Sequence, residues 1–300
     1  MGHPPGWKKA PPLPTDGLKA SCVTQGGFSE PGSAMPLPTE IPRANVLGVG
    51  VHAINMAQAV DLIDVAVQEG RKGYVCITGV HGVMEAQRDA ALKAILNCAF
   101  LTTPDGMPTV WVGKWQGFHS MGRVYGPELM LELCRLSVAR GYTHFFYGGK
   151  PGLAEQLGTE LSRRFPGLRI VGTFSPPFRD LDLAEEAELL STVAKCKPDF
   201  FWVGLSTPKQ ERFMARYLDR LPTTLMLGVG AAFDVHTGGI WDAPAWVKNA
   251  GLQWLHRLCQ EPQRLWRRYL INNPKFIWHI LLQHAGLGDT TSNRASTIGR

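Results

Sequence analysis

Residues 143–173 read THFFYGGKPGLAEQLGTELSRRFPGLRIVGT, and this stretch carries the alternation that decides the fold. The apolar run Thr143–Gly148 predicts a buried strand, and the amphipathic run Leu153–Arg164 predicts a helix. Leu168–Thr173 then predicts a second strand. A strand, a helix and a further strand in this order form the unit from which parallel sheets are built.

The same alternation recurs on both sides of this stretch. Further strands are predicted at Asn45–Val49, Gly73–Thr78, Asp199–Gly204 and Thr224–Val229. Helices are predicted at Asn55–Glu69, Gly82–Asn97, Pro127–Ala139, Asp182–Lys195 and Pro208–Leu218. The sequence therefore predicts an α/β fold with a mostly parallel, Rossmann-like sheet flanked by helices. In such sheets ligands bind beyond the carboxyl ends of the strands.

Composition divides the chain of 300 residues into four parts. Residues 1–42 form a Pro/Gly-rich arm that is expected to be disordered, and residues 43–242 form the α/β domain. Residues 243–284 are rich in Trp and Arg and predict a helical appendage, and residues 285–300 form a polar tail. No apolar run is long enough to span a bilayer, and the six cysteines are widely spaced without a zinc-ligand pattern, so we expect a cytoplasmic protein without structural zinc.

The formal net charge of +6 is concentrated at the carboxyl end, where residues 244–300 hold eight Lys or Arg and two acids. Arg257, Arg264 and Arg267 are separated by seven and three residues, so one helical face could present all three if Pro262 does not turn it away. Tryptophans are interleaved with these cations. Nucleic acid, a solvated basic face, and an anionic phospholipid or diphosphate all remain open as explanations.

Two loop segments contain candidate functional groups. Asp105 lies in a loop framed by Pro and Gly, where it could act as a general base, although an Asx-turn or helix cap explains the same pattern. Gly149 and Lys150 follow the strand Thr143–Gly148 and could place backbone N–H groups and one ammonium near a phosphate. The full P-loop pattern is absent, so a plain turn remains an alternative.

Three further motifs bear on ligands and cofactors. Gln210 could hydrogen-bond a sugar or a base, or lie on a solvated helix face. The segment Gly48–Gly50 lacks the third glycine of a dinucleotide-binding loop, which argues against NAD. Asp180 and Asp182 resemble a metal-binding D-x-D, but capping of the following helix explains both acids, so we expect no metal site.

Read in order, several motifs between residues 43 and 284 resemble one family. They are Thr-Pro-Asp-Gly at 103–106, Arg-Val-Tyr-Gly at 123–126, Gly-Gly-Lys-Pro-Gly at 148–152, Pro-Lys-Gln-Glu at 208–211, Gly-Val-Gly-Ala-Ala-Phe-Asp at 228–234 and Gly-Leu-Gln-Trp-Leu-His-Arg-Leu-Cys-Gln-Glu-Pro-Gln-Arg-Leu-Trp-Arg-Arg-Tyr-Leu at 251–270. This constellation resembles the WecG/TagA/CpsF glycosyltransferases.

The resemblance implies an inverting transferase that moves a sugar of the ManNAc, ManNAcA or glucose type from a UDP-sugar to a polyprenyl-diphosphate-linked saccharide. Such an enzyme would serve exopolysaccharide or cell-wall polymer synthesis and would use neither metal nor cofactor. It would attach peripherally to the anionic inner face of the plasma membrane, and it could form a homo-oligomer. No nucleic-acid partner is implied.

The resemblance also implies roles for individual residues. Asp105 would be the general base, and Thr78 and Arg123 would hold the diphosphate region. Gln210 would contact a sugar, and Asp234 would lie at the nucleotide pocket. Arg257, Arg264 and Arg267 match arginines of a carboxyl-terminal appendage that reaches the active site at the membrane.

One position departs from the family pattern. Many members read Thr-x-Asn-x-Glu where this chain reads Thr-Gly-Val-His-Gly at 78–82, so His81 stands in place of an asparagine. A substrate-binding role and a purely structural role for His81 are both open, and the departure bears on donor preference.

Two readings from other classes stand beside the transferase. A non-catalytic protein that binds nucleic acid or a membrane surface would account for the basic carboxyl end. A nucleotide-dependent oxidoreductase would account for the α/β pattern.

Overall fold

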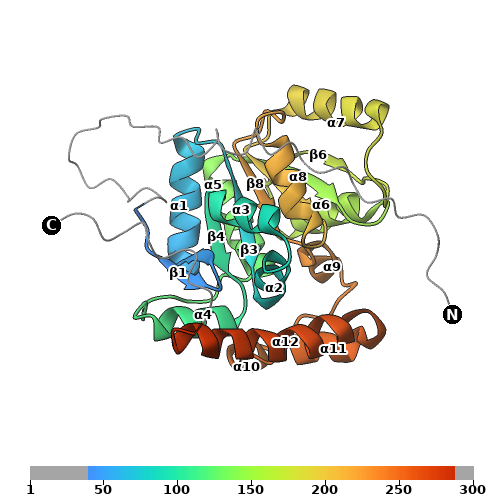
Figure 1. Cartoon of the computed structure of the whole chain (residues 1–300). Coiled ribbons are helices and arrows are strands. Elements are labelled where there is room, and N and C mark those ends of the chain that lie inside the picture. Colours follow the sequence, from blue (N-terminus) through green and yellow to red (C-terminus); the bar gives the residue numbers. More distant parts are fainter. Residues whose placement is uncertain (1–39, 288–300) are drawn as a thin grey trace, which may run out of the picture. The chain divides into compact units, whose positions relative to one another are not determined.

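The computed structural model describes residues 40–287, and its centre is a parallel six-stranded sheet (Figure 1). The strands lie in the order β4-β3-β8-β7-β5-β6, and every neighbouring pair is parallel. Their bounds are β3 Gly73–Thr78, β4 Leu101–Pro104, β5 Thr143–Gly148, β6 Arg169–Phe174, β7 Phe200–Gly204 and β8 Leu225–Gly228. The predicted α/β class with a mostly parallel sheet is confirmed.

Helices cover both faces of this sheet because its central strands are apolar on both sides. In β7, Phe201 and Val203 belong to one buried cluster, and Phe200 and Trp202 belong to the other. The first cluster includes side chains of α2 Val80–Ala86, α3 Ala90–Cys98, α7 Leu183–Cys196 and α8 Lys209–Tyr217. The second includes side chains of α1 Met56–Gln68, α5 Gly126–Arg140, α6 Leu153–Arg164 and α9 Ala232–His236. Packing on both faces therefore fixes the positions of the carboxyl ends of the central strands.

The predicted strand Asn45–Val49 is wrong. These residues contribute instead to an antiparallel hairpin of β1 Arg43–Val46 and β2 Val49–His52, which is separate from the main sheet. The chain reverses at Leu47 and Gly48, whose φ angles are 55° and 81°, in the left-handed region that a tight hairpin turn requires. Gly48 therefore makes this turn, which is consistent with the argument against a dinucleotide-binding loop.

Two further differences concern the segment between β3 and α5. The predicted helix Gly82–Asn97 is two helices, because Asp89 accepts a hydrogen bond from the N–H of Leu92 and caps α3 after α2 has ended. The strand β4 and the helix α4 Met107–Trp115 were not predicted. β4 has only four residues, of which two are threonines.

The predicted cap at Asp182 is confirmed. Its side chain accepts the N–H of Glu185, and the Glu185 side chain accepts the N–H of Asp182, which is a complete capping box at the start of α7. Within residues 40–287, no group of three or more His, Cys, Asp or Glu side chains could hold a metal ion.

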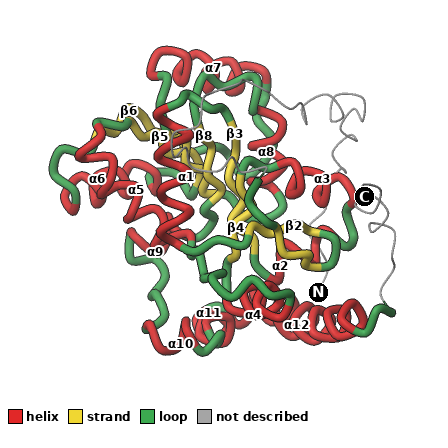
Figure 2. Tube along the Cα trace, turned by 90° about the vertical axis from the view of Figure 1, so that its left-hand side faces the viewer, coloured by secondary structure: helices red, strands yellow, loops and turns green. Residues whose placement is uncertain are grey.

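The basic carboxyl-terminal segment is helical, as predicted. It forms α10 Ala245–Asn249, α11 Gln253–Gln260 and α12 Pro262–His284, and these helices lie beside α4 in Figures 1 and 2. α12 packs against α2, which follows β3. Arg257, Arg264 and Arg267 do not lie on one continuous helix. Arg257 belongs to α11, which ends at Gln260, and the other two belong to α12, which begins at Pro262. None of the helices in the described range is long and apolar enough to cross a membrane.

Of the predicted arm at 1–42, only residues 40–42 are among the described residues, and they lead directly into β1 at Arg43. Of the predicted tail at 285–300, only residues 285–287 are described.

Candidate active site

The candidate site lies at the carboxyl edge of the sheet, where the segments after β3, β4, β7 and β8 meet the appendage. Thr78, Asp105 and Gln210 come from three of these segments, and Arg257 and Arg268 come from α11 and α12. The electrostatic effects of both arginines reach Asp105, which places the appendage beside the sheet edge. The structure therefore brings together groups that are up to about 190 residues apart in the sequence.

Backbone contacts fix the position of Asp105. Its N–H donates to the carbonyl of Thr78 at 3.0 Å, which joins the ends of β3 and β4. Its own carbonyl accepts the Thr109 hydroxyl at 3.3 Å, from the first turn of α4. The N-cap of α4 is Gly106, with φ 85°, and no side chain caps this helix. The Asp105 carboxylate is thus left available rather than used as a helix cap.

The backbone at position 79 comes so close to the Asp105 carbonyl that only glycine fits there. A Cβ at Gly79 would lie 2.8 Å from the Asp105 carbonyl oxygen and 3.6 Å from Oδ2. Only glycine at position 79 therefore lets the two strand ends come together.

The surroundings of Asp105 raise the pKa of its carboxyl group, which favours proton transfer. Loss of hydration raises the pKa of Asp105 to about 6, and Arg123, Arg268 and Arg257 counteract this effect, whereas Glu128 adds to it. A carboxylate with this pKa is mostly ionised at pH 7 and accepts a proton more readily than an ordinary aspartate. This is the property expected of a general base.

Thr78 is the last residue of β3, and His81 lies in the first turn of α2. Thr78 is buried, and its hydroxyl has no hydrogen-bond partner among the described residues. Burial, together with the nearby charges of Arg268 and Arg88, lowers the pKa of His81 to about 3, although a hydrogen bond with the Thr207 backbone opposes this effect. His81 is therefore neutral at physiological pH, so it can form hydrogen bonds at the site but supplies no positive charge.

Gln210 and Glu211 form a buried polar pair in the first turn of α8. Both are almost inaccessible to solvent, at 3% and 1% exposed. Gln210 Nε2 donates to the Gly228 carbonyl at 3.2 Å and to Glu211 Oε1 at 3.1 Å. Glu211 Oε1 also accepts the Thr207 hydroxyl at 2.9 Å. Gln210 is therefore not on a solvated helix face.

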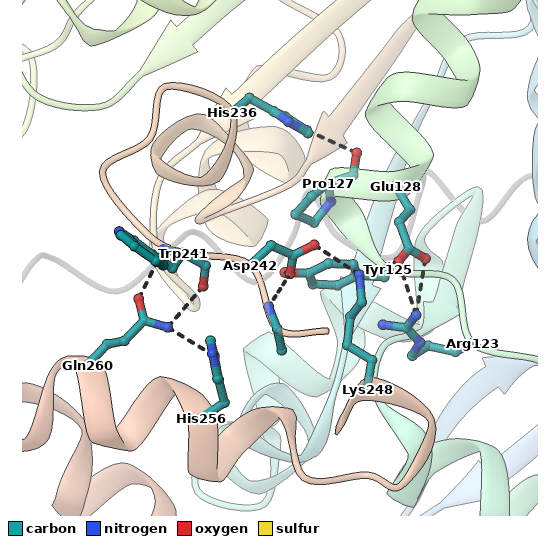
Figure 3. Close-up of polar contacts among 11 residues, drawn as sticks. Arg123, Tyr125, Pro127, Glu128, His236, Trp241, Asp242, Lys248, His256 and Gln260 are labelled. Atoms are coloured by element: carbon teal, nitrogen blue, oxygen red, sulfur yellow. Dashed lines mark hydrogen bonds and ion pairs between the residues drawn. The ribbon is translucent and has the colours of Figure 1, made fainter. Parts of the chain in front are cut away.

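Arg123 belongs to a charged network that joins α5 to the appendage (Figure 3). It pairs with Glu128 at 3.1 Å, and Glu128 also accepts the Lys248 ammonium of α10 at 2.7 Å. Lys248 pairs in addition with Asp242 at 2.9 Å, and Asp242 accepts the Tyr125 hydroxyl at 3.0 Å. This network holds α10 against the start of α5, next to the site.

A second set of contacts fastens α11 to the loop after α9. The Gln260 side chain accepts the N–H of Trp241 at 3.0 Å and donates to its carbonyl at 2.9 Å (Figure 3). These contacts add to the network around Lys248 and to the packing of α12 against α2.

The appendage arginines differ in their placement. Arg257 is largely buried and pairs with Glu261 at 3.1 Å, whereas Arg264 is exposed and pairs with the same acid at 2.9 Å. Arg267 is exposed, and its guanidinium lies 5.1 Å from the centre of the Trp266 ring. Arg268 points the other way: its Nε is buried without a partner among the described residues, and its charge reaches Asp105, His81 and Glu211. Sequence reasoning selected Arg257, Arg264 and Arg267, and in the structure the charges of Arg257 and Arg268 are the ones from the appendage that act on Asp105.

The remaining predicted site residues lie further along the sheet edge or behind it. Gly149 donates its N–H to the Gly204 carbonyl at 3.2 Å, and Lys150 beside it is exposed. Both follow β5, which is separated from β3 by two strands. Asp234 is half-buried in the first turn of α9, which follows β8. Gly149 and Lys150 therefore lie further along the sheet edge than Asp105, whereas Asp234 follows β8, the strand beside β3.

Sequence reasoning missed Arg268, Glu211 and Lys248 as members of the site. Glu211 was quoted within the Pro-Lys-Gln-Glu motif, yet an acid in the first turn of a helix is ordinarily explained by the helix dipole. A signal for Arg268 was present, since it follows Arg264 by four residues and Arg267 by only one, so the two neighbours must point to different sides of the helix.

A parallel sheet whose carboxyl edge carries a carboxylate of raised pKa near three arginines is typical of an α/β enzyme site. The sequence profile of the glycosyl transferase WecG/TagA/CpsF family matches residues 44–289. The chain belongs to this family, as the motifs predicted.

Two relatives carry the same name, N-acetylglucosaminyldiphosphoundecaprenol N-acetyl-beta-D-mannosaminyltransferase. The protein from Bacillus spizizenii is 30% identical over 197 residues, which cover 66% of this chain and 74% of the relative. The protein from Bacillus subtilis strain 168 is 26% identical over 196 residues, which cover 65% of this chain and 74% of the relative.

Family membership identifies the chain as an enzyme, a glycosyltransferase. The two competing readings, a non-catalytic basic binding protein and a nucleotide-dependent oxidoreductase, are therefore set aside.

Proposed function

We propose that the enzyme transfers a hexose of the ManNAc, ManNAcA or glucose type from a UDP-sugar to a saccharide linked to a polyprenyl diphosphate. The names of both relatives support this acceptor class, since they describe transfer of N-acetylmannosamine to N-acetylglucosaminyldiphosphoundecaprenol. The product would enter an exopolysaccharide or a cell-wall polymer.

The observation that carries the proposal is the partly buried Asp105 carboxylate, with its raised pKa, among three arginines. In the reaction, the acceptor hydroxyl attacks the anomeric carbon while its proton passes to Asp105. The bond from that carbon to the diphosphate oxygen breaks, and UDP leaves with the bonding electrons. A single displacement of this kind inverts the anomeric configuration.

Fixed cations supply the second requirement, which is stabilisation of the departing UDP. Arg123, Arg257 and Arg268 all lie near enough to Asp105 to affect its pKa. Preorganised positive charge is most effective where negative charge develops during the reaction. We therefore assign the diphosphate to these three arginines and expect that no divalent metal is needed.

The appendage offers the features of a surface that rests on anionic lipid. Residues 244–287 contain six Lys or Arg and one Glu. Trp246 and Trp278 of the appendage are 70% and 61% exposed, and Trp241 just before it is 80% exposed. Cations and interfacial tryptophans together favour peripheral binding to an anionic membrane, and each basic residue contributes about 1 kcal/mol. Attachment to the inner face of the plasma membrane would bring the site to its lipid-linked acceptor.

One experiment tests the proposed function directly. The purified enzyme is incubated with a panel of UDP-sugars and an N-acetylglucosaminyl lipid diphosphate, and the product is identified by mass spectrometry and its anomeric configuration by NMR. We expect one UDP-sugar to give a disaccharide with inverted configuration. A retained configuration, or transfer only from another nucleotide sugar, would contradict the proposal.

A further inference from the structure

The buried pair Gln210 and Glu211 has hydrogen-bonding capacity that the protein itself does not use. Gln210 Oε1 and Glu211 Oε2 are both buried, and neither has a hydrogen-bond partner among the described residues. An unpaired polar atom in a buried position costs free energy, so native proteins retain one mainly where a ligand completes it. The pair lies at the carboxyl end of β7, beside the end of β8.

The orientation of the Gln210 amide follows from its partners. Nε2 faces two oxygen atoms, the Gly228 carbonyl and Glu211 Oε1, at 3.2 and 3.1 Å. If the amide were flipped, its oxygen would face the Gly228 carbonyl oxygen, and one hydrogen bond would become a repulsive contact. The amide oxygen is therefore directed away from both partners, toward Gly230, where a Cβ would lie 3.5 Å from it.

Two glycines at the end of β8 leave room for this arrangement. A Cβ at Gly228 would lie 3.1 Å from Gln210 Nε2 and 2.7 Å from the end of the Met214 side chain. Gly230 has φ 54°, which also favours glycine. The backbone of β8 thus approaches the amide closely without side chains that would fill the space in front of its oxygen.

Glu211 holds the other side of the amide. Its Oε1 accepts from both Thr207 and Gln210, which fixes the carboxyl between the loop after β7 and the amide. Burial raises the pKa of Glu211, and hydrogen bonds from its own backbone, Thr207 and Gln210, together with the charge of Arg268, oppose that rise. The role of Oε1 is that of an acceptor in either protonation state.

We propose that Glu211 is a positioning residue that presents the Gln210 amide oxygen to the donor nucleotide sugar as a hydrogen-bond acceptor. The ligand group on that oxygen must then carry an O–H or N–H donor. A sugar hydroxyl, an acetamido N–H and the uracil N–H all have this chemistry. The inference rests on the proposed function for the identity of the donor substrate.

The role of Glu211 predicts non-additive effects of substitution. Glu211→Met removes the acceptor for the Gln210 amide, and Gln210→Met removes the amide itself. We expect each variant to lower kcat/KM by about tenfold to a hundredfold, the range for loss of one buried hydrogen bond. The double variant should lose no more than Gln210→Met alone, because Glu211 acts through Gln210.

A conservative variant separates positioning from general structural support. Glu211→Gln keeps an acceptor oxygen for Thr207 and Gln210, so kcat/KM should recover to within a few-fold of wild type. Glu186 is the matched control, because it is a partly buried acid that accepts the Tyr217 hydroxyl and pairs with Arg220 at the far end of α8. Glu186→Met should lower the melting temperature and leave KM for the donor unchanged.

Binding measurements identify which part of the donor meets the oxygen. Calorimetric titration of wild type and Gln210→Met with UDP and with the UDP-sugar is compared. Loss of affinity for both ligands assigns the contact to the nucleotide, and loss for the UDP-sugar alone assigns it to the sugar. Equal affinities of wild type and Gln210→Met for both ligands would overturn the inference.

Comparison of the two single variants with the double variant provides a second outcome that would contradict the inference. If Glu211→Met and Gln210→Met lower kcat/KM additively while wild type transfers the sugar, Glu211 does not act through Gln210. Failure of the wild-type enzyme to transfer any sugar would instead refute the proposed function, so the two failures are distinguishable.

Discussion

Replacement of Arg268 by Gln tests the electrostatic design of the site, and Arg267→Gln is its matched control. The two arginines are adjacent in α12, but Arg267 is exposed beside Trp266, whereas the charge of Arg268 reaches Asp105. Any effect specific to Arg268 therefore arises from its direction and not from the net charge of the appendage.

The expected effect of Arg268→Gln on sugar transfer has two parts, and each part is measured at a different pH. Arg268 favours the ionised form of Asp105, so its removal should raise the pKa of Asp105 from about 6. We expect a rise of about one unit, the lower end of the range for a neighbouring charge, because Arg123 has the larger effect and remains. At pH 7 this change reduces the ionised fraction only from about nine tenths to one half.

The second part is the loss of charge opposite the departing diphosphate. At pH 8, where Asp105 is largely ionised in both proteins, we expect kcat/KM to fall about a hundredfold, as for loss of one preorganised group in an oxyanion site. The sign of the pH dependence follows from the base: as pH falls through the pKa of Asp105, the carboxylate is protonated and transfer declines.

The assay is the pH profile of kcat/KM from pH 5 to 9 with a short-chain, soluble acceptor, so that membrane binding plays no part. Arg267→Gln should reproduce the wild-type profile in both the acid limb and the plateau. A wild-type plateau and acid limb in Arg268→Gln would refute the assignment of this arginine to the site.

Three further predictions concern the appendage and the metal requirement. Lys248→Met removes the partner of both Glu128 and Asp242. Because these acids are partly exposed, we expect a loss of about 1–2 kcal/mol in the free energy of unfolding, measured by urea denaturation. An unchanged unfolding midpoint would show that these ion pairs do not hold α10 in place. Trp246→Ser with Trp278→Ser should weaken binding to anionic liposomes without changing turnover of the soluble acceptor. A chelator should leave transfer unchanged, and inactivation that manganese or magnesium specifically reverses would show that a metal is needed.

Elements with strong periodicity could be predicted from the sequence, and short or interrupted ones could not. Leu153–Arg164 is a helix with the bounds that its apolar spacing predicts, and Gly73–Thr78 is a continuous apolar strand buried on both faces. The four residues of β4 contain two threonines and end in Pro104, so they lack an apolar run, and only pairing with β3 makes them a strand. The sequence within such a segment carries too little information to predict it.

The candidate site divides in the same way. Asp105 could be proposed because Pro104 and Gly106 frame its loop, and Gln210 could be proposed because it follows a strand end and Pro208 at a predicted helix start. The choice between Arg267 and Arg268 could not be made, since it depends on the direction of α12 after the break at Glu261. That direction is set by packing of α12 against α2, a contact between segments about 180 residues apart.

The effect of Asp105→Asn on sugar transfer tests the central claim most directly. Asparagine keeps the size of the side chain but cannot accept a proton, so folding and UDP binding should be nearly unchanged while kcat falls about a hundredfold or more. The remaining activity should also lose the acid limb that wild type shows near pH 6. Transfer by the purified Asp105→Asn enzyme at close to the wild-type rate would contradict the account.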